Sequence, residues 1–281
     1  MLGQIIPEFT LNDGMKLPVV GLGTYTLRGS EGVQSIVNAI RSGYRLLDSA
    51  YNYENEGTVG EAVRRSAVPR EELIIASKLP GRYHTYDKAV KAIQESLYRA
   101  QLDYYDLYLI HWPNPIQGHY AEAWQALIDA KRWGLVRSIG VSNFLPDHLD
   151  RLVKETGVTP SVNQIELHPF FNQAEQRKYH EEHGIITESW SPLAHGNDVL
   201  NHETIRQIAE RHGKSVSQII LRWHYQLGAV SIPKSASAAR QLENLSIFDF
   251  ALDEGGMGRI SGLTRPDGRL RNQDPAVYEE F

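Results

Sequence analysis

The chain has 281 residues, 41% of them hydrophobic, with a formal net charge of −5 and a pI near 6.1. This charge argues against nucleic acid or an anionic membrane surface as the main partner, because both attract concentrated positive charge. The absence of cysteine excludes disulfides, metal-thiolate sites and thiol nucleophiles, and it fits a cytoplasmic protein. The segment Met1–Pro7 lacks the features of a signal peptide, and no apolar stretch reaches membrane-spanning length, so we expect neither secretion nor a membrane span.

Short apolar or β-branched runs alternate with amphipathic stretches of helical length along most of the chain. The runs are Val19–Gly23, Arg45–Asp48, Leu73–Lys78, Leu107–His111, Ser138–Ser142, Val162–Glu166, Ile185–Trp190 and Ala229–Ile232. The helical stretches include Gly32–Ser42, Gly57–Ala67, Tyr86–Ala100, Tyr120–Trp133, Pro146–Glu155 and Gln173–His183. Repeated strand–helix units give parallel strands, and eight such units can close on themselves. We therefore expect an α/β fold, a (β/α)8 TIM barrel forming a single domain over residues 1–281.

Two segments lie outside this repeat. Phe9–Leu17 is typical of a β-hairpin, with a type I′ turn at Asp13-Gly14 or Asn12-Asp13, and the hairpin could cap one mouth of the barrel. The residues from about Asp253 onward are expected to form a C-terminal helix and loop. The main alternative fold is an open, doubly wound sheet.

Three short patterns resemble nucleotide or metal motifs without matching them. Gly21–Gly23 would begin a dinucleotide-binding fingerprint, but its third glycine is replaced by Thr26 and no helix follows at once. Gly213–Ser215 resembles the end of a phosphate-binding loop, but the glycine required five residues earlier is Ile208. The segment His180–His183 matches no zinc-protease spacing and is better explained as a solvated helix face, so we expect no metal site.

Four polar residues stand at or just after the ends of predicted strands: Asp48, Tyr53, Lys78 and His111. The carboxyl-terminal strand ends of a TIM barrel form its functional rim, so these side chains would face one pocket. Each residue alone is more often structural than catalytic. Together they are harder to dismiss, because charged groups that interrupt apolar strands are costly unless they are paired.

These residues predict a tuned proton donor. An ammonium about 4 Å from a phenolate stabilises it by roughly 4 kcal/mol at an effective dielectric near 20, so Lys78 alone would lower the pKa of Tyr53 by about two to three units. Asp48 would keep Lys78 charged while partly offsetting its effect on the phenol. His111 could donate a hydrogen bond to the substrate oxygen that Tyr53 protonates. Addition of hydride from a cofactor to a carbonyl needs such an acid, but no nucleophile or metal.

The sequence resembles the aldo-keto reductase superfamily from the hairpin to Phe250. The segments that carry the resemblance are Gly43–Glu56, Val59-Gly60, the strand of Lys78, Leu109–Pro113 and Gly140–Phe144. Within the superfamily the chain most resembles the bacterial branch that includes 2,5-diketo-D-gluconate reductases. The resemblance implies an NADPH-dependent reductase of aldehydes or ketones, with Asp48, Tyr53, Lys78 and His111 as the catalytic tetrad and Tyr53 as the general acid.

The resemblance also implies a set of cofactor contacts. Ser142, Asn143 and Gln164 match residues that bind the nicotinamide carboxamide, which needs both donors and acceptors. Trp190 matches an aromatic residue that stacks on the nicotinamide face, with Ser191 and Leu193 along the pyrophosphate. Capping of strand ends and a core tryptophan are the structural alternatives.

A second cofactor segment follows the last predicted strand. By resemblance, Lys234 and Arg240 would bind the 2′-phosphate of NADPH together with Ser235, while Glu243 and Asn244 would contact the adenine. A strand end that runs into a helix N-terminus favours anions, and two cations beside it suit a phosphate. The alternative is a lysine and an arginine on a solvated helix surface.

The substrate side is less well defined. Five residues after strand ends are expected to line it: Tyr25, Asn52, Pro80, Tyr83 and Trp112. Many relatives carry a pocket tryptophan after the Lys78 strand, whereas this chain has Pro80–Tyr83, so that wall is built differently. Part of Arg265–Phe281 is expected to fold over the same rim, and Arg269 and Arg271 could favour acidic substrates.

Two other functions stay open at the level of sequence. Some relatives serve as channel-associated subunits, so a nucleotide-sensing or scaffold protein with little turnover is the first alternative; the complete tetrad favours catalysis. A Schiff-base aldolase that uses Lys78 would keep the barrel but would leave the Lys234 segment unexplained. The resemblance favours a monomer whose partner is a small carbonyl substrate.

Overall fold

The computed structural model describes residues 6–196 and 198–281. Met1–Ile5, part of the segment in which we expect no signal peptide, lie outside the described residues. The strands are β1 (Glu8–Thr10), β2 (Lys16–Pro18), β3 (Leu22–Gly23), β4 (Leu46–Asp48), β5 (Ile74–Leu79), β6 (Tyr105–Ile110), β7 (Val136–Ser142), β8 (Val162–Glu166), β9 (Ile186–Trp190) and β10 (Ala229–Ser231). The helices are α1 (Gly29–Ser42), α2 (Glu56–Arg65), α3 (Tyr86–Ala100), α4 (Tyr120–Arg132), α5 (Pro146–Thr156), α6 (Ala174–Glu182), α7 (Glu203–His212), α8 (Val216–Gln226), α9 (Ala238–Leu245) and α10 (Glu254–Ser261).

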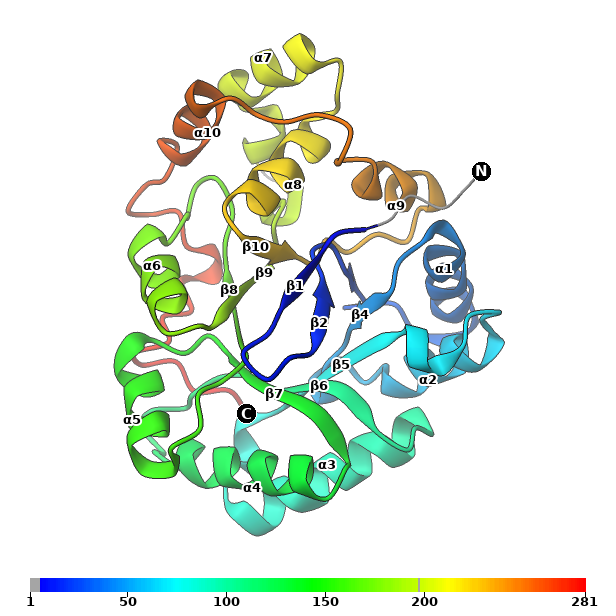
Figure 1. The fold of residues 1–281 in the computed structure, drawn as a ribbon, viewed down its shortest axis with the longest axis vertical. Helices are drawn as coiled ribbons and strands as arrows, with labels where there is room; N and C mark the ends of the chain where they lie inside the picture. Colours follow the sequence, from blue (N-terminus) through cyan, green and yellow to red (C-terminus); the bar gives the residue numbers. More distant parts are fainter. Residues whose placement is uncertain (1–5, 197) are drawn as a thin grey trace.

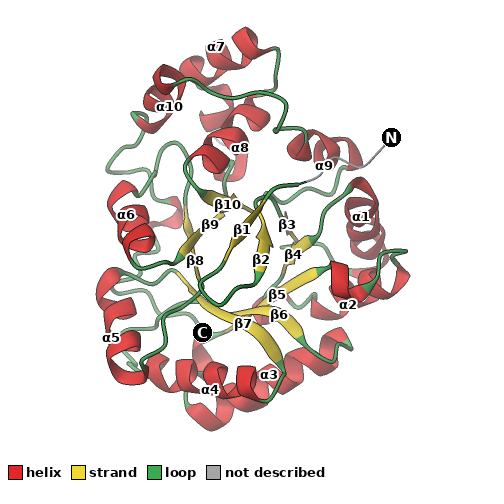
Figure 2. Ribbon diagram, viewed as in Figure 1, coloured by secondary structure: helices red, strands yellow, loops and turns green. Residues whose placement is uncertain are grey.

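The strands β3 to β10 form a parallel sheet in chain order, and the helices surround it (Figure 1). Isolated parallel bridges join Val20 to Ser231 and Gly23 to Lys234, which brings the first and last strands together. Figure 2 shows the strands gathered at the centre, with the β1–β2 hairpin lying across one mouth. The expected TIM barrel with a hairpin cap is therefore confirmed, and the open doubly wound sheet is excluded.

The predicted elements match the observed ones closely where the hydrophobic pattern is strong. Helix α3 and strand β8 have the predicted boundaries, and the other strands differ by a few residues at their ends. Gly21 and Gly23 are packed too closely against neighbouring residues to carry a side chain, as expected for glycines of a barrel strand. A Cβ on Gly21 would lie 2.6 Å from Leu46 Cγ, and a Cβ on Gly23 would lie 2.8 Å from the carbonyl oxygen of Ile232.

The hairpin turn differs from the prediction. A type I′ turn needs a positive φ at both central residues, whereas among residues 11–15 only Gly14 has one, at 90°. The loop from Leu11 to Met15 instead contains a turn in which the Gly14 N–H donates to Leu11 O at 3.0 Å, and the Leu11 N–H donates to Met15 O at 2.9 Å. The longer loop places the left-handed conformation on the one residue that adopts it without strain.

The apolar core has two layers. Inside the barrel, Leu11 and Leu17 of the hairpin pack against strand residues such as Leu46, Leu107 and Val230, so the hairpin plugs the barrel floor. Between the strands and the helices, larger clusters bury residues from most helices. Because the hairpin fills the barrel floor, a cavity can open only at the opposite mouth, where the carboxyl ends of the strands lie.

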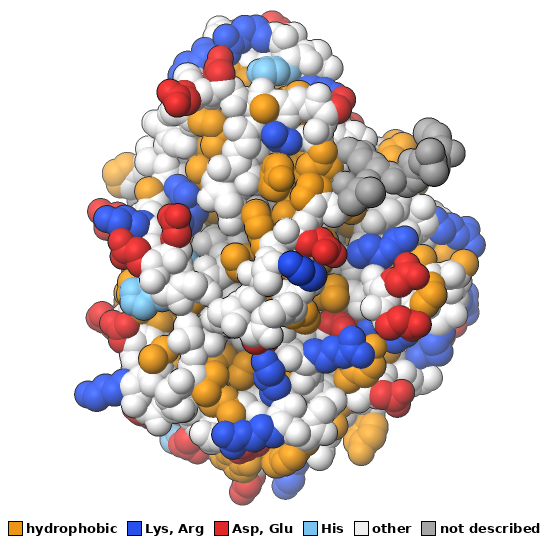
Figure 3. Space-filling model, viewed as in Figure 1, with side chains coloured by type: hydrophobic (Ala, Val, Ile, Leu, Met, Phe, Trp, Pro, Cys, Tyr) orange, Lys and Arg blue, Asp and Glu red, His pale blue; other side chains and the backbone are white. Residues whose placement is uncertain are grey.

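On the hairpin face, Lys and Arg side chains alternate with Asp and Glu side chains (Figure 3). No single block of one charge dominates this view, in keeping with the modest net charge of −5. Within the described residues, no helix combines the length and the apolar character needed to cross a membrane.

Candidate active site

A buried ion pair joins two adjacent strand ends. Lys78 Nζ in β5 lies 2.7 Å from both carboxylate oxygens of Asp48, the last residue of β4, and it also donates to the backbone oxygen of Ser49 at 2.8 Å. Lys78 is fully buried and Asp48 is 2% exposed. Burial opposes the charge on Lys78, but the Asp48 carboxylate, helped by Tyr53 and Glu188, outweighs this effect and raises the pKa of Lys78, so the side chain is an ammonium.

Tyr53 lies above this pair, in the short 3-10 helix η1 (Tyr51–Tyr53) that follows β4. Lys78 Nζ is 5.1 Å from the centre of the Tyr53 ring. Burial raises the pKa of Tyr53 to about 12, and the charges of Asp48 and Glu280 add to this increase, while Lys78 opposes it. The direction of the Lys78 effect is the predicted one. The expected net decrease in this pKa is wrong, because the cost of burying a phenolate exceeds the stabilisation from the ammonium.

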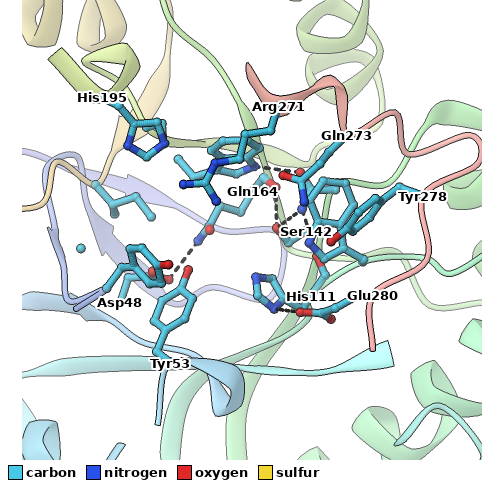
Figure 4. Close-up of a pocket in the computed structure, with 17 residues that line it drawn as sticks. Asp48, Tyr53, His111, Ser142, Gln164, His195, Arg271, Gln273, Tyr278 and Glu280 are labelled. Atoms are coloured by element: carbon cyan, nitrogen blue, oxygen red, sulfur yellow. Dashed lines mark hydrogen bonds and ion pairs between the residues drawn. The ribbon is translucent and has the colours of Figure 1, made fainter. Parts of the chain in front are cut away.

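His111 directly follows β6 and presents its ring to Tyr53. The ring centres lie 5.9 Å apart at an interplanar angle of 78°. On its other side, His111 Nδ1 lies 2.7 Å from Oε1 of Glu280 (Figure 4). Glu280 is thus the carboxylate partner of the His111 imidazole.

The tetrad opens into a cavity of about 250 Å³ at the carboxyl ends of the strands. Asp48, Tyr53 and His111 line the cavity, and Lys78 lies behind Asp48. In Figure 4, Tyr53 and His111 face the hollow from the strand side, while Arg271 and Gln273 approach it from the segment after α10. The structure thus brings the four predicted catalytic residues together at one place.

The residues predicted to hold a nicotinamide carboxamide also lie on this wall. Ser142, at the end of β7, donates to Gln164 O at 2.8 Å, and Asn143 Nδ2 donates to His111 O at 3.0 Å. Asn143 Oδ1 accepts from the indole N–H of Trp190 at 2.8 Å. Because these polar groups already have partners, a bound carboxamide would have to share or replace some of their hydrogen bonds.

Gln164 connects this wall to the ion pair through a second buried carboxyl group. Its Nε2 donates to Asp48 Oδ1 at 2.9 Å and to Glu188 Oε1 at 3.1 Å. Burial raises the pKa of Glu188, and the nearby Asp48 carboxylate raises it further. Sequence reasoning missed Glu188, which looked like an ordinary polar residue in the strand β9.

Ser191 and Leu193, predicted to lie along the pyrophosphate, have different surroundings. Ser191 lines the cavity and its hydroxyl lies 3.2 Å from Nε2 of His195, another residue of the cavity wall. Leu193 packs against the hydrophobic clusters instead. A pyrophosphate contact from Leu193 would therefore involve its backbone.

The residues predicted to bind the 2′-phosphate follow β10. Lys234 and Arg240 are exposed, and Ser235 is largely buried, where its hydroxyl accepts from the Ser237 N–H at 3.2 Å. Ser237 caps helix α9, and Arg240 lies in the first turn of that helix. Both cations are thus near the positive end of a helix dipole, a favourable place for an anion.

Of the two predicted adenine contacts, Glu243 has a structural partner and Asn244 is buried. Glu243 accepts a hydrogen bond from Ser215, the residue that caps helix α8. Asn244 is 4% exposed. Glu243 therefore helps to hold α8 and α9 together, whatever it contacts in a ligand.

The five predicted substrate contacts divide into two groups. Tyr25 and Trp112 line the cavity; Tyr25 meets the edge of the Tyr53 ring at a centroid distance of 5.0 Å. Asn52, Pro80 and Tyr83 lie outside the residues that line it. Asn52 donates to Glu280, a residue of the cavity wall, and therefore supports that wall from behind, while Tyr83 packs against Tyr51 at a ring-centre distance of 5.3 Å.

Part of the segment Arg265–Phe281 lines the cavity, as predicted, through Gln273, Tyr278 and Glu280. These three residues were not predicted individually, and His195, in the loop after β9, was not predicted at all. Arg271, named among the tail arginines, lines the cavity, whereas Arg269 lies in an adjacent smaller pocket. The described residues contain no cluster of His, Asp and Glu suited to a metal ion.

Comparison with known proteins agrees with this geometry. Residues 19–265 match the model of the aldo/keto reductase family. The chain is 55% identical to 2,5-diketo-D-gluconic acid reductase B of Corynebacterium sp. (strain SHS752001), over 98% of this chain and 99% of that protein. It is 44% identical to methylglyoxal reductase DkgA of Escherichia coli (strain K12), over 95% and 96% of the two chains.

Solved structures give the same result. A variant of Gox0644 in complex with NADPH matches with a TM-score of 0.93 and 41% identity, covering 98% of this chain and 100% of that one. An aldo/keto reductase from Brucella melitensis matches with a TM-score of 0.89 and 45% identity, covering 92% and 100%. The chain therefore belongs to the aldo/keto reductase family.

Proposed function

We propose that this chain is an NADPH-dependent oxidoreductase that reduces the aldehyde or ketone group of a small substrate to an alcohol. The observation that carries this function is the phenol of Tyr53, which faces the cavity directly above the buried Lys78–Asp48 pair. Carbonyl reduction requires a proton donor that can reach the substrate oxygen. Tyr53 can serve as this donor, with the imidazole of His111 beside it in the same cavity.

Each tetrad residue has a distinct role in the proposed reaction. NADPH, when bound, supplies the hydride that adds to the carbonyl carbon. The carbonyl oxygen becomes negative as its carbon is reduced, and Tyr53 transfers its phenolic proton to that oxygen. An alkoxide is a stronger base than a phenolate, so a phenol with a pKa of about 12 still protonates it. Lys78 stabilises the resulting phenolate, while Asp48 keeps Lys78 charged and oriented.

The residues present fit the cofactor. The amide of Asn143 and the hydroxyl of Ser142 offer donors and acceptors for a carboxamide, and the ring of Trp190 offers a flat apolar surface beside them. Ser191 would lie along the pyrophosphate, while the exposed cations Lys234 and Arg240 at the start of α9 would hold the 2′-phosphate. These assignments support NADPH over NADH.

The residues of the cavity wall and the names of the relatives both support a narrower class of carbonyl substrate. Two of the relatives are named for 2,5-diketo-D-gluconic acid and for methylglyoxal, both small molecules with more than one carbonyl group. In this chain, Arg271 lines the cavity together with the aromatic residues Tyr25 and Trp112. We infer that small keto acids and dicarbonyl compounds are preferred substrates.

The function is tested by following NADPH oxidation with a panel of carbonyl compounds. The panel contains 2,5-diketo-D-gluconate, methylglyoxal, neutral aldehydes, α-keto esters and quinones. We expect turnover with several members and faster turnover with the first two. Tight NADPH binding without oxidation by any member would reject the reductase and favour a nucleotide-sensing protein.

We further propose that the enzyme acts as a monomer in the cytoplasm. The absence of cysteine suits a reducing compartment. The tetrad and the cavity wall are complete within one chain, so catalysis needs no second copy. Sedimentation at working concentration tests the oligomeric state, and a stable dimer would reject the monomer.

A further inference from the structure

The segment after α10 brings a buried carboxylate into the catalytic rim. Glu280 is 7% exposed. Its Oε1 accepts from Asn52 Nδ2 at 2.7 Å, and its Oε2 accepts from the backbone N–H of Gly81 at 3.1 Å. The third contact is His111 Nδ1, 2.7 Å from Oε1. One side chain thus touches the loops after β4, β5 and β6.

The backbone of Glu280 is fixed as firmly as its side chain. Asn114, fully buried in the loop after β6, donates to Glu280 O at 2.7 Å and accepts from the Glu280 N–H at 3.1 Å. Asn114 also fills the space beside Gly81, where a Cβ would lie 2.2 Å from its Nδ2. Two residues earlier, Tyr278 packs on Trp112 with ring centres 4.4 Å apart. Glu280 is therefore held in place independently of its contact with His111.

The charge of Glu280 has a partner in His111. Burial alone would raise the pKa of Glu280, but the charge of His111 and the hydrogen bonds that the carboxylate accepts outweigh it, so the pKa is lowered. Other groups around the carboxylate are Tyr53, His84 and, through Asn52, Arg82. None of these three forms an ion pair with Glu280 in the described part of the chain.

The contact selects which ring nitrogen of His111 carries a hydrogen. A carboxylate accepts only, so a neutral ring with its lone pair on Nδ1 would face Glu280 with two acceptors 2.7 Å apart. Nδ1 is buried and has no hydrogen bond of good geometry to any described residue, although Oε1 of Glu280 lies 2.7 Å away. Hydrogen bonds between catalytic groups commonly tighten when substrate binds.

We propose that Glu280 is a positioning residue for the carbonyl reduction proposed above: its carboxylate keeps a hydrogen on Nδ1 of His111 and turns Nε2 toward the substrate oxygen. Donation from Nε2 to this oxygen while Nδ1 donates to Glu280 requires a hydrogen on both ring nitrogens. Glu280 acts through His111 and does not touch the reacting atoms.

The first test changes the charge without changing the shape. Glu280→Gln should lower kcat roughly tenfold or more, the size expected when a hydrogen bond to a charged group is lost, with the Kd for NADPH unchanged. Glu279→Gln is the matched control, because its carboxylate binds the Ile116 N–H at 2.7 Å and makes no contact with His111. It should retain wild-type kcat.

A double-mutant cycle separates positioning from a structural role. In a His111→Gln background, Glu280→Gln should change kcat by less than about twofold, because its effect passes through the imidazole. Equal losses in both backgrounds would overturn the proposal, since they would mean that Glu280 merely holds the tail segment (residues 262–281).

A measurement on the cofactor-free wild-type protein needs neither turnover nor a variant at Glu280. Nitrogen-15 spectra of labelled histidine show which ring nitrogens carry hydrogen, and His111→Gln identifies the His111 signals. We expect a hydrogen on Nδ1. A neutral ring with hydrogen only on Nε2 would overturn the proposal even if the enzyme is active, while the expected spectrum in an inactive protein would reject the proposed function alone.

Discussion

Lys78 Nζ lies 2.7 Å from both oxygens of the Asp48 carboxylate, and the two side chains are almost completely shielded from water. Neither charge would be stable alone at this depth, because each loses its hydration on folding. The pair therefore links stability to catalysis: the ammonium that stabilises the Tyr53 phenolate exists because the carboxylate is there.

The first prediction concerns this pair and the stability of the fold. Lys78→Met leaves the buried Asp48 carboxylate without its cation and should lower the free energy of unfolding by about 3–5 kcal/mol. The double variant Asp48→Asn/Lys78→Met should recover part of that loss. Urea unfolding measures both. Lys178→Met is the control, since the Lys178–Glu182 pair is exposed at 3.7 Å and should contribute little; similar losses in all three variants would contradict this account.

The second prediction concerns the titration of Tyr53 in the cofactor-free protein. Because burial raises the pKa of Tyr53 to about 12, its phenol stays protonated through the range near 10 where a free phenol ionises. The Lys78 ammonium lowers this pKa, so Lys78→Met should shift the titration of Tyr53 to still higher pH. The difference in phenolate absorbance between wild type and Tyr53→Phe reports it. A phenolate signal from Tyr53 below about pH 10 would contradict the prediction.

The third prediction concerns cofactor choice. Arg240→Ala should raise the KM for NADPH roughly tenfold or more while leaving that for NADH nearly unchanged, because only NADPH carries the 2′-phosphate. Arg259→Ala, an exposed arginine on α10, is the matched control. An unchanged preference for NADPH over NADH in Arg240→Ala would remove Arg240 from the phosphate site.

The fourth prediction concerns Arg271. If its guanidinium binds the carboxylate of keto acids, Arg271→Gln should lower kcat/KM for a keto acid by about 10- to 100-fold, with little effect on a neutral aldehyde of similar size. A rise in the KM for NADPH that is equal for both substrates would instead assign Arg271 to the cofactor pyrophosphate.

Most of the fold could be predicted from the sequence, because local hydrophobic patterns determine it. The apolar runs at β8 and the amphipathic period of α3 are strong enough to give their boundaries, and the strand order follows from the alternation. The hairpin turn was mispredicted because Asn12, Asp13 and Gly14 all favour turns. The structure has a longer loop from Leu11 to Met15 in place of either two-residue turn.

The site was only partly predictable, for reasons of distance along the chain and of solvation. The strand-end residues were found because their polarity interrupts apolar runs. Glu280 could not be found in this way: it meets Asn52 across 228 positions, and no local pattern marks it. The pKa of Tyr53 depends on how deeply the phenol is buried, which no spacing of charges reveals.

The role of Tyr53 as general acid is the central claim and needs a variant that changes one atom. Tyr53→Phe removes the hydroxyl but keeps the ring that packs on Tyr25 and His111. Tyr98→Phe, on an exposed tyrosine of α3, controls for the loss of a hydroxyl elsewhere and should behave as wild type.

The most direct test is the rate of NADPH oxidation by Tyr53→Phe with the best carbonyl substrate, measured beside its Kd for NADPH. We predict a loss of about 10²- to 10⁴-fold in kcat, the usual contribution of a general acid, with the Kd for NADPH unchanged. Turnover close to that of the wild-type enzyme would show that another group supplies the proton and would contradict the account.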